Sequence, residues 1–275
     1  ADYRIGFKWW ALIIAVVFVI SELVCVVCVP ERPVACDEKP GKISDMFKAL
    51  FKNDQAMTVV VSIILVYTSL NICGNLVLYF FRFDVGNEGA YSIFAAVAFA
   101  AQVLVMMVIP LLRKRFSKSQ LFISGFIIQI AGFAVIFIMA FAKLYTPQSW
   151  YILCLPGILI YLGYGMLNVI MTIFLSDSVD YGEVMNGTRE ESVIFSMQTF
   201  TVKLASGVAV FLAGLVVDWI HLDTAAAVQT QDTLDALRMW MTIPSVILLI
   251  VGIFVFKRFY KLDDTRMEEI KSKLN

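Results

Sequence analysis

The sequence contains a single histidine, His221, among its 275 residues. Histidine is the most frequent metal ligand and the most frequent general acid or base, so this scarcity argues against a zinc site, a haem site or a catalytic triad. The five cysteines offer no substitute. Cys25 and Cys28 form a CxxC pair, but it lies in an apolar run without a second pair or a nearby histidine. We therefore predict no enzymatic activity, no metal and no cofactor.

Charge is also scarce, since 16% of the residues are charged and the formal net charge is zero. Soluble domains carry about 25% charged residues and about 45–50% apolar ones. This chain is 60% hydrophobic, and its basic residues lie in short loops beside apolar runs rather than on one basic face. That pattern argues against nucleic-acid binding and indicates a polytopic membrane protein.

Long apolar runs predict an all-α protein with about seven transmembrane helices. Each run approaches or exceeds the roughly 20 residues that a helix needs to cross a bilayer. The expected spans cover residues 9–29, 56–80, 91–112, 120–142, 150–175, 193–217 and 239–259. No soluble domain fits between them.

Lysine and arginine are divided unevenly between the two sides of these spans. Sixteen of the 22 lie in segments 30–55, 113–119 and 176–192 and in the tail from residue 257. Five lie on the opposite side, and Lys203 lies inside a span. Because cytoplasmic loops are enriched in basic residues, we expect a cell (inner) membrane protein whose N-terminus here is outside and whose C-terminus is cytoplasmic.

The longest polar stretch, residues 30–55, divides the chain. Within it, residues 43–54 have the pattern of a short amphipathic helix at the membrane surface. One span before this stretch and six after it suggest one half of a six-plus-six transporter. The expected parts are the last helix of an N-terminal half at 1–29, a cytoplasmic central loop at 30–55, a six-helix bundle at 56–260 and a cytoplasmic tail at 261–275.

Lys203 is the most informative residue of the sixth span. It lies about ten residues into a helix predicted over 193–217, near the bilayer midplane. A cation there costs about 2.5–3.5 kcal/mol, so its side chain should face protein or water. One face of the helix is shared by Lys203 and small or polar residues: Ser196, Thr199, Ser206, Gly207 and Gly214. The stripe fits a packed helix interface or a functional surface, and the ammonium group favours the latter.

Other spans also carry polar or helix-breaking residues at depth. Pro156 and the glycines after it predict a fifth span that bends or opens. Uncharged amides are expected to bond to a neighbouring helix, or to line a wet cavity with Lys203. These amides are Asn71, Asn75, Gln102, Gln129 and Asn168.

The run DSVDYGEVMNGTREESVIFSMQTFTVKLAS resembles the signature region of the glycoside–pentoside–hexuronide:cation symporters, sugar transporters of the major facilitator superfamily. The matching positions include Asp177, the DYGE segment 180–183, Arg189, Glu191, Gln198, Thr199 and Lys203. FKNDQA before the second span, YFFRFDVGNEG after it and KRFYKLDD at the end of the seventh agree in register. The similarity extends along the whole chain.

This resemblance implies that the spans are helices 6–12 of a twelve-helix transporter. Such a transporter couples uptake of a sugar or glycoside to Na⁺ or H⁺ by alternating access. The N-terminal half, which holds the cation ligands in this family, would then be absent from this chain. The implied substrate-binding residues are Lys203, Thr199, Gln198 and Asn168, with Lys203 also coupling the cation. Asn168 replaces a tryptophan of one family member, which leaves the sugar open.

The same resemblance implies a cytoplasmic gate. Asp177, Arg189 and Glu191 match residues that pair with charges on the other half and close the cytoplasmic side. The alternative is a solvated loop, in which such ion pairs contribute about 0–1 kcal/mol each.

Two other functions are considered. A carrier of a non-sugar solute or lipid would use the same fold, because a fold does not specify a substrate. A seven-helix photoreceptor would bind retinal through a buried lysine, but Lys203 is on the sixth span rather than the last, and the acidic signature would have no role. The expected partners are a sugar, a coupling cation, the lipid bilayer and the N-terminal half of the transporter.

Overall fold

The computed structural model describes residues 3–28, 51–187, 191–226 and 228–274. These residues contain helices and no strand, which confirms the all-α class. Seven of the described helices are long and apolar enough to cross a membrane, as predicted. Most of the amphipathic helix predicted over residues 43–54 lies outside the described residues.

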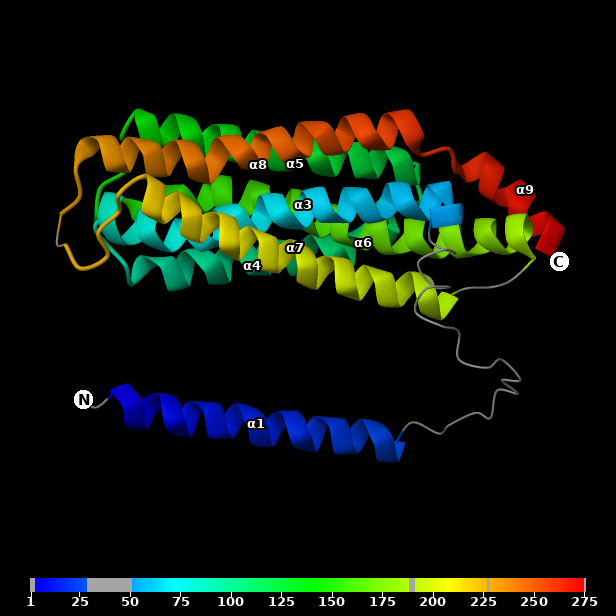
Figure 1. The fold of residues 1–275 in the computed structure, drawn as a ribbon, viewed down its shortest axis with the longest axis horizontal. Helices are drawn as coiled ribbons and strands as arrows, with labels where there is room; N and C mark the ends of the chain where they lie inside the picture. Colours follow the sequence, from blue (N-terminus) through cyan, green and yellow to red (C-terminus); the bar gives the residue numbers. More distant parts are fainter. Residues whose placement is uncertain (1–2, 29–50, 188–190, 227, 275) are drawn as a thin grey trace. The chain divides into compact units, whose positions relative to one another are not determined.

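The chain divides into two compact units, residues 1–42 and 43–275. The first contains α1 (Tyr3–Cys28), an almost wholly apolar helix of 26 residues. In the second unit, long helices lie side by side, and the short helix α9 and the α7–α8 loop are at opposite ends (Figure 1). Its long helices are α3 (Asp54–Tyr79), α4 (Ala90–Leu112), α5 (Lys118–Phe141), α6 (Cys154–Asn186), α7 (Glu191–Trp219) and α8 (Gln231–Phe259). Its short elements are η1 (Phe80–Asp84), η2 (Trp150–Leu153) and α9 (Asp264–Leu274).

Side-chain caps set several helix ends of the second unit. The Asn53 side chain accepts a hydrogen bond from the Ala56 N–H at 2.9 Å, and so begins α3. Ser117 and Gln120 form a reciprocal capping box at the start of α5. Gly187, with φ 73°, ends α6 in the left-handed conformation that glycine adopts without strain. These caps satisfy backbone groups that a helix end leaves unpaired.

The core of the second unit is organised around two helices. α3 packs against α6, α7 and α8, whereas α6 packs against α4 and α5. Aromatic rings fill the space between α5, α6 and α8. Phe122 contacts Phe174 and Phe256 at centroid distances of 5.1 and 4.5 Å.

The fifth span does not open, because α6 is a continuous helix from Cys154 to Asn186. A bend within this helix stays a prediction. The glycines of α6 allow close packing. A Cβ at Gly163 would lie 2.5 Å from the Gly125 carbonyl oxygen and 2.6 Å from the Gln129 nitrogen of α5. A larger residue at position 163 would therefore push α5 and α6 apart.

Two predicted boundaries were wrong, and both errors occur where charges begin. The fifth span was expected to end at residue 175, but α6 continues to Asn186 through the acidic run. The seventh was expected to start at residue 239, but α8 starts at Gln231 and includes Arg238. Ionic partners on other elements keep such charged residues inside a packed helix, and hydropathy alone does not reveal those partners.

Candidate functional site

Lys203 and Thr199 lie on the exposed side of α7 within the second unit, and Gln198 is half-buried. The Thr199 hydroxyl donates to the Phe195 carbonyl at 3.3 Å. No described carboxylate forms an ion pair with Lys203. The buried side of the helix is formed by other residues: Ile194, Met197, Thr201, Ala205, Ala209, Ala213 and Val216. Within this unit, the predicted polar stripe is therefore a surface and not the packing face of α7.

Asn168 belongs to a polar contact between α6 and α3. Its Nδ2 donates to the Tyr67 hydroxyl oxygen at 2.5 Å. The Tyr67 ring meets Tyr164 edge to face, with centroids 5.5 Å apart. Since α7 also packs along α3, that helix connects the element carrying Asn168 to the element carrying Lys203.

Three of the amides at depth in the spans behave differently from the prediction. Asn71 donates to the Tyr67 carbonyl and Asn75 to the Asn71 carbonyl, each at 2.7 Å and each within α3. Gln129 is 0% exposed, and its amide atoms have no hydrogen-bond partner among the described residues. The expected bonds to a neighbouring helix are therefore wrong for these three residues and confirmed for Asn168, which donates to Tyr67 of α3. The bonds within α3 fix the amides of Asn71 and Asn75 on a half-exposed face.

The polar face, as we define it, comprises Tyr67, Asn71 and Asn75 on α3, Asn168 on α6, and Thr199 and Lys203 on α7. Phenol, amide, hydroxyl and ammonium groups supply donors and acceptors on otherwise apolar membrane helices. A few polar groups placed on an apolar surface are typical of small-molecule sites, where they set orientation and specificity. This arrangement suits a neutral ligand rich in hydroxyl groups.

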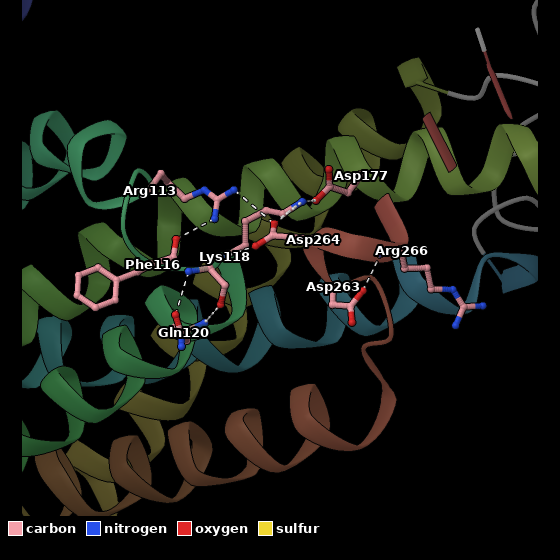
Figure 2. Close-up of polar contacts among 9 residues, drawn as sticks. Arg113, Phe116, Lys118, Gln120, Asp177, Asp263, Asp264 and Arg266 are labelled. Atoms are coloured by element: carbon pink, nitrogen blue, oxygen red, sulfur yellow. Dashed lines mark hydrogen bonds and ion pairs between the residues drawn. The ribbon is translucent and has the colours of Figure 1, made fainter. Parts of the chain in front are cut away.

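A second cluster lies at the end of the unit that carries α9 (Figure 2). Asp177 of α6 is 5% exposed and forms an ion pair with Lys118, the first residue of α5. The Lys118 Nζ also lies 3.5 Å from an oxygen of Asp264, and Arg113 lies 3.4 Å from the same carboxylate. This ion cluster joins α5, α6, α9 and the end of α4.

The three predicted gate residues have different positions in the structure. Asp177 is buried in the ion cluster, Glu191 begins α7 on its exposed side, and Arg189 lies outside the described residues. Sequence reasoning missed Lys118, Arg113 and Asp264 as partners. The basic segment 113–119 was the available signal, because its charges must lie beside the end of the fifth span if the helices are antiparallel.

Two motifs of the sequence meet beside this cluster. The Asn53 Nδ2 of the FKND segment donates to the Ser178 carbonyl of α6 at 2.8 Å. A Cβ added to Gly182 of the DYGE segment would lie 2.8 Å from the same nitrogen. Glycine at 182 thus leaves room for Asn53, which links α6 to the start of α3.

We expect Gly182→Val to lower the free energy of unfolding by about 1–3 kcal/mol, the usual cost of overpacking. The added methyl groups would displace the Asn53 side chain and break its bonds to Ser178 and Ala56. Chemical unfolding of the purified protein measures the loss. With Asn53→Ala already present, the same substitution should cost clearly less, and equal costs in the two backgrounds would contradict this contact.

The apolar spanning helices, the buried ion cluster and the polar face define a multi-pass membrane protein with a candidate site for a polar solute. Residues 3–264 match the family described as MFS/sugar transport protein, and the chain belongs to this family. The match confirms the resemblance identified from the signature region, and it gives no support to a retinal-binding photoreceptor.

Curated relatives agree with this assignment. The chain is 26% identical over 233 residues to the uncharacterised symporter YjmB of Bacillus subtilis, covering 85% of this chain and 49% of the relative. It is 25% identical to the raffinose carrier protein of Pediococcus pentosaceus, covering 98% and 42%. It is 24% identical to the isoprimeverose transporter of Lactiplantibacillus pentosus, covering 94% and 52%. The chain spans about half the length of these relatives.

Proposed function

We propose that this chain is the C-terminal part of a secondary active transporter that couples uptake of a sugar or glycoside to Na⁺ or H⁺ by alternating access. The polar face is the observation that carries the proposal, because an unpaired ammonium and fixed amides on membrane helices need a polar ligand or a wet cavity. The names of the relatives, which include carriers of raffinose and isoprimeverose, support a sugar as the ligand.

Lys203 has two roles in this proposal. Its ammonium group donates to sugar hydroxyls, and it pairs with carboxylates of the N-terminal half when the coupling cation is absent. Thr199 and Asn168 line the same cavity, and Gln198 lies at its border. Asp177, Arg189 and Glu191 contribute to closing the cytoplasmic end, where Asp177 already pairs with Lys118.

The proposed orientation follows from the basic residues. The end that carries the ion cluster and α9 faces the cytoplasm, and the α7–α8 loop faces outward across the cell membrane. The proposed partners are a sugar, a coupling cation, the bilayer and the N-terminal half of the transporter.

Uptake by the complete protein tests this function. Cells that express it are given labelled raffinose, isoprimeverose, lactose and a glucuronide, with and without a Na⁺ or H⁺ gradient. At least one sugar should accumulate only with a gradient. Lys203→Ala should reduce that uptake by about 10–100-fold, the effect of losing one charged hydrogen bond to the ligand.

Leu204→Ala provides the control, because Leu204 is the exposed apolar neighbour of Lys203 on α7. It should leave uptake within about twofold of the unmodified protein. Uptake that survives Lys203→Ala would make the polar face a packing surface for other helices. If none of the four sugars moves, a carrier of a non-sugar solute or lipid becomes the better explanation.

A further inference from the structure

A pocket lies between α3 and α7, toward the end of α7 beyond Lys203. Its cavity has a volume of about 360 Å³, within the usual range of roughly 300–1,000 Å³ for small-molecule sites. Its lining residues are Asn75, Tyr79, Val210, Ala213, Gly214, Val217 and Asp218. Asp218 is fifteen positions beyond Lys203, or about 22 Å along the helix. Asp218 therefore lies well beyond Lys203, while the pocket shares Asn75 with the polar face.

Asp218 is the unusual member of this lining. It is exposed in the last turn of α7, and no described residue forms an ion pair or side-chain hydrogen bond with it. The C-terminal end of a helix carries partial negative charge and disfavours a carboxylate. An unpartnered anion at this end, lining a pocket, contributes no favourable contact to the described fold and is available to a ligand.

The other pocket residues define what the ligand must be. The Asn75 amide is held by its bond to the Asn71 carbonyl at 2.7 Å, and its oxygen accepts no bond from the described residues. Tyr79, whose ring stacks in parallel with Phe83 at a centroid distance of 6.5 Å, also lines the pocket. A carboxylate, an amide oxygen and a phenol bind hydroxyl groups, and the carboxylate repels anions.

Gly214 forms part of the pocket wall. A Cβ built on this residue meets no atom within 4 Å, so the cavity begins at the helix backbone. The pocket is wide and partly open to its surroundings, and it offers one carboxylate, which is a poor cage for a bare metal ion. A sugar ring, with several hydroxyl groups and an apolar face for Val210 and Val217, fits this lining better.

We propose that this pocket is an entry site that binds a neutral sugar before it reaches the polar face near Lys203. The inference rests on the proposed sugar transport and adds a substrate class, because Asp218 selects neutral sugars over uronides. The pocket is lined by residues of the last turns of α7, including Asp218. These turns lead into the α7–α8 loop, at the end opposite α9 (Figure 1). A sugar arriving from that end meets Asp218 first.

Two substitutions in the complete protein test this site. Asp218→Asn removes the charge, and Gly214→Leu fills the cavity. For the neutral sugar of the panel with the highest uptake, each should raise the half-saturation concentration about tenfold and leave the maximal rate within twofold. Uptake of the labelled glucuronide, where it is detectable, should be unchanged or improved by Asp218→Asn. Asp232→Asn is the control, since Asp232 is an exposed acid in the first turn of α8 at the same end.

A direct measurement of sugar binding distinguishes a sugar site at this pocket from a purely structural role of Asp218. Trp219 follows Asp218 and contacts Trp240 at a centroid distance of 5.3 Å, so tryptophan fluorescence reports on this end of the pocket. In Lys203→Ala protein, the same sugar should still change the fluorescence, and adding Asp218→Asn should abolish that change.

The outcomes distinguish this inference from the proposed function. If the unmodified protein takes up none of the sugars, both fail. If it transports a sugar and Asp218→Asn leaves the half-saturation concentration unchanged, the entry site alone is overturned. A further outcome is that the Gly214→Leu and Asp218→Asn proteins lose thermal stability while sugar binding stays normal. That result would show that another part of the complete protein fills the pocket, and it would also overturn the entry site.

Discussion

Replacing Arg238 by methionine is expected to lower the free energy of unfolding by about 3–5 kcal/mol, the cost of breaking a buried ion pair by removing one partner. The Arg238 side chain is 2% exposed and that of Asp84 is 4% exposed. Its Nε and Nη2 donate to the two carboxylate oxygens of Asp84 at 2.8 and 2.5 Å. Without the guanidinium group, Asp84 is a buried anion with too few donors.

The surroundings of this pair explain the size of the effect. The Tyr145 hydroxyl donates to Asp84 at 2.6 Å, and Arg238 Nη1 donates to Asp235 at 2.6 Å. Burial, followed by the bond to Asp84, raises the pKa of the Tyr145 hydroxyl, which keeps it protonated as a donor. The network joins η1, α8 and the segment between α5 and η2, so one substitution loosens three elements.

Unfolding of the purified protein by heat or denaturant provides the measurement. Arg82→Met is the matched control, because Arg82 lies in η1 with Asp84 but forms an exposed ion pair with Glu88 at 3.7 Å. It should cost less than about 1 kcal/mol. Combining Asp84→Leu with Arg238→Met should recover much of the loss, since a hydrophobic pair can replace a buried ion pair. A loss from Arg238→Met no larger than the control's would contradict the assigned network.

The second large effect is expected at the ion cluster, where Lys118→Met should cost about 3–5 kcal/mol. Asp177 is buried, and Lys118 is its described ion-pair partner. Lys118 has a further carboxylate within 3.5 Å, that of Asp264. Removing Lys118 therefore leaves Asp177 as a buried anion without its described partner. Asp177→Leu leaves Lys118 paired with Asp264, so its loss in the free energy of unfolding should be clearly smaller.

This asymmetry can be measured by unfolding both variants under the same conditions. Lys114→Met is the control, because Lys114 is exposed just beyond α4 and has no described ion pair. It should change stability by less than about 0.5 kcal/mol. An equal loss for Lys118→Met and Asp177→Leu would show that Asp264 does not support Lys118 in the folded protein.

The polar face was partly predictable. Lys203 and Thr199 were chosen from helical periodicity and the signature region, and the structure places both on the exposed side of α7. Asn168 was chosen as a polar residue deep in a span and from the resemblance, and its partner Tyr67 is 101 positions away. The Asn75–Asp218 pocket was not predicted, because nothing in the local sequence shows that α3 and α7 pack together.

The amino-acid sequence determined the class of this protein. An apolar segment of about 20 residues inserts into a membrane whatever its neighbours are, so composition and length predicted the seven spans. The signature region identified the family. Both signals are local, since each depends on residues close together along the chain.

The tertiary structure decided which charges are buried, where α6 ends and where α8 starts. Asp84 and Arg238 are 154 positions apart, and Lys118 and Asp177 are 59 apart. A charge remains inside a packed helix only when a partner compensates its desolvation. Such partners are distant in sequence, so the prediction from hydropathy placed the end of the fifth span before Asp177 and the start of the seventh after Arg238. In the structure both residues lie within packed helices.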